Sequence, residues 1–103
     1  MGGFVYMLQC ADDSYYVGSA RNDDLGQRVA EHQAGVYQGY TSTRLPVHLV
    51  WSEYFERITD AIAAERKIKG WSRAKKEALI RGDWTAIKRL ARRRAGKPKS
   101  SSL

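Results

Sequence analysis

The chain has 103 residues, a formal net charge of +7 at pH 7 and 43% hydrophobic residues, which suits one small domain with a modest core. Cys10 is the single cysteine, so an intramolecular disulfide and a cysteine-based zinc finger are excluded. No apolar run reaches the roughly 18 residues of a membrane span, and the first residues lack the pattern of a secretory signal. We therefore expect a cytoplasmic protein without a membrane partner.

The charge is distributed unevenly along the chain. Residues 1–60 contain four Lys and Arg against eight Asp and Glu, whereas residues 61–103 contain fourteen against three. A basic C-terminal half indicates a polyanionic partner, which is DNA, RNA or, less often, an anionic membrane. The alternative is a basic surface that only keeps the protein soluble, and charge alone does not decide between them.

The N-terminal part predicts an antiparallel hairpin. Residues 3–11 are mainly apolar and aromatic, Asp12-Asp13-Ser14 is a turn signal, and residues 15–19 form a second short strand. Tyr6 and Tyr16 share a sheet face if a three-residue loop at 12–14 sets Cys10 opposite Tyr16, and a two-residue loop would place them on opposite faces. Gly18 either ends the second strand or admits a phosphate or a backbone.

A helix and a third strand follow. Asp23 or Asp24 is expected to cap a helix that runs to about Ala34, with Gly35 ending it. After a polar loop, residues 47–55 predict a strand in which Val47, Leu49 and Trp51 alternate with His48, Val50 and Ser52.

The C-terminal half predicts three helices. They are expected from Thr59 or Asp60 to Gly70, from Ser72 to near Gly82, and from Asp83 to about Arg94. The order ββα-β-ααα predicts an α+β fold, with a three-stranded antiparallel sheet flanked by helices. We expect residues 1–82 to form the domain, 83–94 a basic helix packed on it, and 95–103 a flexible tail.

Glu65 is the most informative position of the helical half. It falls within an apolar stripe formed by Ile58, Ala61, Ile62 and Ile68. A carboxylate there is costly unless a cation or hydrogen bonds satisfy it, which suggests a ligand for Mg²⁺ or Mn²⁺. The alternative is an ion pair with Lys69 one turn later, and the residues alone favour this pair.

Arg28 and His32 lie four residues apart and therefore on one face of the first predicted helix. An arginine suits a phosphate, and a histidine can exchange a proton near neutral pH. The alternative is a solvent-facing arginine and a histidine packed over the sheet edge, which the residues alone favour.

Two groups of basic residues remain. The first group surrounds Trp71 and consists of Lys67, Lys69, Arg73, Lys75 and Lys76. It suits a platform for phosphates and bases, although Trp71 is equally suited to anchoring a helical corner in the core. The second group, Lys88, Arg89 and residues 92–94, predicts an electrostatic arm without sequence preference.

Taken in order, these residues resemble the GIY-YIG nuclease family. The resemblance rests on Phe4-Val5-Tyr6, Tyr16-Val17-Gly18, Leu25-Gly26-Gln27-Arg28 with His32, and Glu65. The segments 44–51 and 64–76 are similar to the small single-domain bacterial branch of that family. The resemblance covers residues 3 to about 80.

The resemblance implies metal-dependent phosphodiester hydrolysis with Mg²⁺ or Mn²⁺. It implies that Tyr6 acts as general base on the attacking water or orients it, that Tyr16 contacts the scissile phosphate, and that Arg28 stabilises the transition-state charge. His32 would assist proton transfer, and Glu65 would bind the metal. In-line displacement at phosphorus needs these roles, namely an activated water, charge neutralisation and a stabilised leaving oxygen.

The chain also departs from the family pattern. Ser19 stands where several relatives carry a lysine, and an asparagine that some relatives place after the metal-binding glutamate has no clear match. Because one small domain offers few base-reading elements, we expect low sequence specificity.

We expect an endonuclease acting on DNA, single-stranded or branched, with RNA open as an alternative. The residues expected to bind the nucleic acid are Arg21, Arg44, Lys69, Arg73, Lys75 and Lys76. The alternative function is a non-catalytic nucleic-acid-binding module on the same fold. We expect a monomer or weak dimer without an obligate protein partner.

Overall fold

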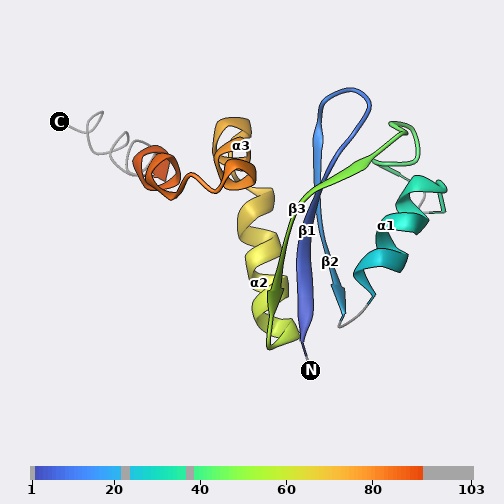
Figure 1. The fold of residues 1–103 in the computed structure, drawn as a ribbon, viewed down its shortest axis with the longest axis horizontal. Helices are drawn as coiled ribbons and strands as arrows, with labels where there is room; N and C mark the ends of the chain where they lie inside the picture. The colour runs from blue at the N-terminus through green and yellow to red at the C-terminus, as the bar shows by residue number, and fades with distance from the viewer. Residues whose placement is uncertain (1, 22–23, 37–38, 92–103) are drawn as a thin grey trace. The chain divides into compact units, whose positions relative to one another are not determined.

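The computed structural model describes residues 2–21, 24–36 and 39–91. By its internal contacts the chain divides into two compact units at Gly70/Trp71. The described part holds three strands and four helices in the predicted order, so the α+β class is confirmed (Figure 1). The domain boundaries expected at residues 82 and 94 stay predictions, and the expected tail at 95–103 lies outside the described residues.

The three strands of the first unit form one antiparallel sheet. They are β1 (Gly3–Gln9), β2 (Tyr15–Arg21) and β3 (His48–Phe55), in the spatial order β2-β1-β3. The second strand runs through Gly18 without ending there. The prediction that Gly18 ends the strand is therefore wrong.

The hairpin between β1 and β2 has a three-residue loop at residues 11–13, not at 12–14. The Cys10 amide donates to the Ser14 carbonyl at 2.8 Å, and Leu8, not Cys10, lies opposite Tyr16. Asp13 closes the loop at a φ of +68°, a left-handed conformation that Asp tolerates better than most residues. Tyr6 is paired with Gly18, so the two tyrosines still share a face of the sheet.

The third strand does not keep the alternation that its sequence predicts. Met7 pairs with Trp51 but Leu8 pairs with Leu49, so Val50 is an extra residue in a β-bulge. The bulge changes which face of the sheet the side chains on either side of it point to. Leu49, which lies next to the bulge, is 42% exposed.

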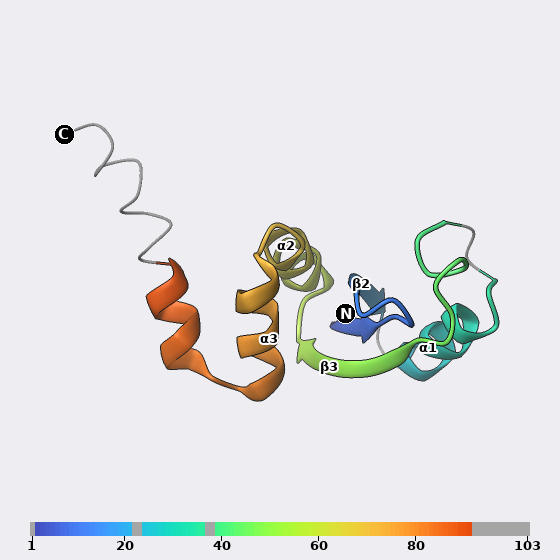
Figure 2. The same ribbon diagram turned by 90° about the horizontal axis from the view of Figure 1, so that it is seen from above.

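The two helices of the first unit cover opposite faces of the sheet (Figure 2). Helix α1 (Leu25–Gln33) packs Leu25 and Val29 against the face of β1 that carries Tyr6. Helix α2 (Ile58–Lys69) lies against the other face, where a side chain at Gly3 would meet Ile58. Strand β2 is the edge strand next to both helices.

The predicted start of α1 is confirmed, whereas α2 starts earlier than predicted. Asp24 precedes α1 but makes no side-chain capping bond. Helix α2 begins at Ile58 after Arg57, one residue before Thr59, and Asp60 lies inside its first turn. In the first turn, the negative charge of Asp60 is stabilised by the positive end of the helix dipole. Aspartate is therefore common both at the cap and in the first turn, which is why the sequence predicted Asp60 as a cap.

The second unit follows the predicted caps. Helix α3 (Arg73–Arg81) is capped at its start by Ser72, whose hydroxyl accepts from the Lys75 amide at 3.2 Å, and at its end by Gly82, which has a φ of +71°. Asp83 Oδ1 then accepts from the Ala86 amide at 3.0 Å, and residues 84–91 are helical. The predicted end at Arg94 lies outside the described residues. Of the helices described, none is long and apolar enough to cross a membrane.

Candidate active site

A buried hydrogen bond between Tyr6 and His32 forms the centre of the candidate site. Tyr6 Oη lies 3.0 Å from His32 Nε2, and the two residues are only 1% and 3% exposed. On the other side of the ring, His32 Nδ1 lies 2.8 Å from Oγ1 of Thr41, which is also buried. The histidine is therefore held at both nitrogens.

Burial sets the charge of this histidine. Desolvation, with a smaller contribution from the Arg28 guanidinium, lowers the pKa of His32 below its ordinary value, against the opposing effect of Glu31. His32 is thus neutral at neutral pH, with one ring nitrogen accepting. When Nδ1 carries the proton and donates to Thr41, Nε2 accepts from the Tyr6 hydroxyl.

Tyr16 joins this pair from the neighbouring strand. Its ring centroid lies 5.0 Å from that of His32 and 6.4 Å from that of Tyr6, and the side chain is half-buried. Gly18 makes this arrangement possible, because an added Cβ there would lie 2.5 Å from Tyr6 Oη. The group that approaches Gly18 closely is the Tyr6 side chain, and the approach of a phosphate stays a prediction.

Arg28 lies at the edge of β2, half-buried. Its Nη1 donates to the Ser19 carbonyl at 3.2 Å, and its Nε lies 3.9 Å from Glu31. A cavity of about 190 Å³ opens beside it, lined by Ser19, Ala20, Arg21, Arg28, Ile58 and Ile62. Two guanidinium-bearing residues on one small cavity suit an anionic group such as a phosphate.

Glu65 projects from α2 with a side chain that is 17% exposed, and its Oε2 lies 2.8 Å from Lys69 Nζ. The ion pair that the sequence offered as an alternative is therefore present. The hydrogen bond to Glu65 is the main cause that raises the pKa of Lys69, against the opposing effect of burial.

Glu65 is the residue of this region whose side chain is of the type that a hard cation binds. In the described ranges, no three His, Cys, Asp or Glu side chains gather into a metal site. Mg²⁺ and Mn²⁺ suit oxygen ligands, and Mg²⁺ commonly takes one or two carboxylates with water and substrate phosphates as its remaining ligands. The single Glu65 carboxylate would supply one such ligand only after the ion pair with Lys69 is broken.

Three of the remaining residues expected to bind nucleic acid, Arg44, Arg73 and Lys75, are already engaged in other contacts. In the first unit, Arg44 pairs with Asp12 at 3.0 Å. In the second unit, Arg73 pairs with Glu77 at 3.0 Å, and Lys75, 8% exposed, lies 4.3 Å over the Trp71 ring. Burial also lowers the pKa of Lys76.

Two residues of the site were not found from the sequence. Thr41 holds His32, and the Tyr40 ring lies 6.2 Å from that of Tyr16. Both residues come from the polar loop before β3. The loop sequence has no regular spacing of apolar residues that would indicate which of its side chains are buried. The sequence held one indication of Thr41, because a buried histidine needs a hydrogen-bond partner at each ring nitrogen.

This fold and this order of residues define a GIY-YIG catalytic domain. A family model for that domain matches residues 2–78, and the chain belongs to the GIY-YIG nuclease family. Within the family it is similar to small proteins named UPF0213. It is 47% identical over 77 residues to one from Natronomonas pharaonis, covering 75% of this chain and 88% of that protein.

A UPF0213 protein of Staphylococcus aureus is 42% identical over 78 residues, covering 76% of this chain and 93% of that protein. Two solution NMR structures are also similar. The UPF0213 protein of Bacillus halodurans is 36% identical with a TM-score of 0.51, covering 78% of this chain and 83% of the other. A protein of E. faecalis is 30% identical with a TM-score of 0.53, covering 80% and 85%. The family assignment implies a nuclease that binds nucleic acid and generally needs a metal ion.

Proposed function

We propose that this protein is an endonuclease that hydrolyses phosphodiester bonds in DNA, single-stranded or branched, with Mg²⁺ or Mn²⁺ and low sequence specificity. The observation that carries the proposal is the buried Tyr6–His32 hydrogen bond, and the arginine-lined cavity at the β2 edge supports it. A neutral histidine that accepts from a tyrosine forms a proton path, and a cavity with two arginines accepts a phosphate. Processing or repair of DNA in the cytoplasm is the role we propose.

The proton path starts at the attacking water. As the water oxygen attacks phosphorus, Tyr6 Oη takes its proton while the tyrosine's own proton passes to His32 Nε2. This transfer avoids a free phenolate, which a tyrosine with a pKa of about 10 does not form readily at neutral pH. Because Tyr6 is 1% exposed, the water reaches it after a side-chain movement, and Tyr16 is the neighbour we expect to move.

The phosphate would be held at the β2 edge. Arg28 and Arg21 line the cavity there, and their guanidinium groups would neutralise charge on the equatorial oxygens. Glu65 would hold the metal, with Lys69 moving from the carboxylate toward the substrate. The metal, when bound, supplies stabilisation of the leaving oxygen.

The alternative function, a non-catalytic nucleic-acid-binding module, is favoured by a specific observation. Tyr6 is buried, and the Glu65 carboxylate is occupied by Lys69 at 2.8 Å. A protein that kept this arrangement when bound would hold a strand without cutting it.

A panel of single-stranded, duplex and branched DNA and RNA, with Mg²⁺, Mn²⁺ or EDTA, tests the proposal. We expect metal-dependent DNA cleavage that falls at least about 100-fold in Arg28→Gln and Glu65→Gln. Glu53→Gln, which changes an exposed carboxylate on β3, is the matched control and should cleave normally. Salt-dependent binding without cleavage in any metal would support the alternative, and activity surviving both site variants would refute the residue assignment.

A further inference from the structure

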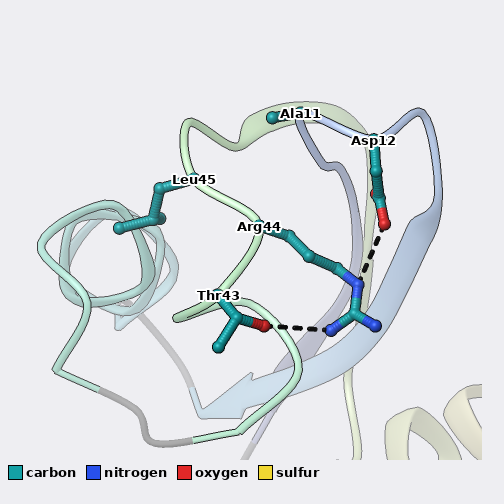
Figure 3. A pocket seen from close by; sticks show the side chains of 5 residues that line it. All are labelled: Ala11, Asp12, Thr43, Arg44 and Leu45. Carbon is teal, nitrogen blue, oxygen red and sulfur yellow. Dashed lines mark hydrogen bonds and ion pairs between the residues drawn. The ribbon is translucent and has the colours of Figure 1, made fainter.

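Arg44 is held rigidly although it lies near the surface (Figure 3). Its Nε donates to Asp12 Oδ2 at 3.0 Å, and its Nη1 donates to the Tyr40 carbonyl at 2.8 Å and to Thr43 Oγ1 at 3.2 Å. The guanidinium plane is thus oriented before any ligand binds. Such preorganisation lowers the entropy that a ligand would have to offset.

The guanidinium stacks on an aromatic ring that leads to the candidate site. Arg44 Cζ lies 3.9 Å from the centroid of the Tyr40 ring, and Tyr40 is 42% exposed. The Tyr40 centroid lies 6.2 Å from that of Tyr16, the residue expected to contact the scissile phosphate. Arg44 therefore lies within about 10 Å of the Tyr16 ring, a distance that one or two nucleotides of a strand span.

An open cavity of about 400 Å³ lies at Arg44 (Figure 3). Its lining residues are Ala11, Asp12, Thr43, Arg44 and Leu45. The lining combines a planar cation, a carboxylate and a hydroxyl with the apolar side chains of Ala11 and Leu45. This mixture suits a flat ligand that has both a stacking face and a polar edge.

The local charge argues against a phosphate as the occupant. Hydrogen bonds from Ser14, and then the Arg44 guanidinium, lower the pKa of Asp12, so its carboxylate is ionised and neutralises Arg44. A phosphate in the cavity would meet that carboxylate at close range. A neutral nucleobase would not be repelled by the carboxylate, and it can stack on an aromatic ring or on a guanidinium plane.

We propose that Tyr40, Arg44 and the cavity beside them form a subsite for one unpaired nucleobase of the strand whose phosphate binds at Tyr16 and Arg28. The inference rests on the proposed function, because the position of the phosphate at Tyr16 and Arg28 is part of that proposal. It assigns Arg44 to base stacking instead of phosphate binding. It also predicts that the preferred substrate has an unstacked base within one or two nucleotides of the cut.

The test measures binding in EDTA, so that cleavage plays no part. Single-stranded DNA oligonucleotides carrying 2-aminopurine at successive positions, and RNA versions of them, report stacking by fluorescence quenching. We expect quenching at one position, and about tenfold weaker binding in both Tyr40→Leu and Arg44→Lys. Tyr54→Leu, which removes another exposed tyrosine of the first unit, is the matched control and should bind as the unchanged protein does.

An abasic nucleotide at the quenched position completes a double-mutant cycle. It should weaken binding to the unchanged protein about tenfold and binding to Tyr40→Leu hardly at all. The proposal is overturned if folded Tyr40→Leu and Arg44→Lys bind as the unchanged protein does, or if their loss of affinity is the same with and without the base. If 2-aminopurine is quenched but the cleavage panel shows no cutting, the nuclease proposal is refuted and the base subsite is kept. If the protein cuts DNA but no position is quenched, the nuclease proposal is kept and the base subsite is refuted.

Discussion

Replacing Gly18 with alanine should separate the Tyr6–His32 pair. The added Cβ would lie 2.5 Å from Tyr6 Oη, 2.7 Å from its Cζ and 3.0 Å from Tyr16 Cε2, whereas ordinary contacts begin at 3.4 Å. The hydroxyl would have to retreat by about 0.9 Å, and Tyr6, at 1% exposure, has little room for this. Overpacking of this kind costs about 1–3 kcal/mol, so we expect the free energy of unfolding to fall by about 2 kcal/mol.

Urea unfolding monitored by circular dichroism measures this loss as a lower midpoint at an unchanged m-value. Gly26→Ala is the matched control. A Cβ at Gly26, in the first turn of α1, would meet no described atom within 4 Å apart from its chain neighbours and the backbone of its own helix. Alanine there should raise the free energy of unfolding by up to about 1 kcal/mol.

A double variant identifies the contact responsible. Tyr6→Phe alone should cost about 1–3 kcal/mol, because it removes the buried hydrogen bond between Tyr6 Oη and His32 Nε2. Tyr6→Phe also removes the hydroxyl oxygen, which is the atom closest to the Cβ of an alanine at position 18. The double variant Gly18→Ala/Tyr6→Phe should therefore lose less free energy of unfolding than the sum of the losses in the two single variants. Strict additivity, or an unchanged urea midpoint in Gly18→Ala, would refute the reasoning.

The remaining predictions concern His32 and Lys69. Because burial lowers the pKa of His32 in the fold, the unfolded chain binds its proton more readily, so this contribution to stability is present above about pH 6.5 and is lost as the pH falls through the folded pKa. Urea midpoints between pH 5 and 8 should show this loss, and an equal slope in His32→Gln would contradict it. Lys69→Met removes the ammonium 2.8 Å from Glu65 and should tighten Mn²⁺ binding several-fold, measured by electron paramagnetic resonance. Glu65→Gln in the same background should abolish that binding, and an unchanged Mn²⁺ affinity in Lys69→Met would show that the lysine does not compete.

The sequence by itself determined the order and type of the elements. Local signals sufficed for this, since apolar runs marked the strands and Ser72, Gly82 and Asp83 marked the ends of helices by their capping chemistry. Helical spacing likewise placed Arg28 and His32 on one face of α1. These features depend on neighbours within a few residues, which a sequence displays directly.

The tertiary structure decided the pairing of the strands and the completion of the site. The hairpin register depends on the left-handed conformation of Asp13, and the facing of β3 depends on a bulge at Val50 that hydrophobic alternation does not encode. Thr41 and Tyr40 join the site from a loop whose sequence is simply polar. Their contacts are hydrogen bonds and ring packing between distant segments, and the energy of such contacts exists only after the sheet and α1 have brought those segments together.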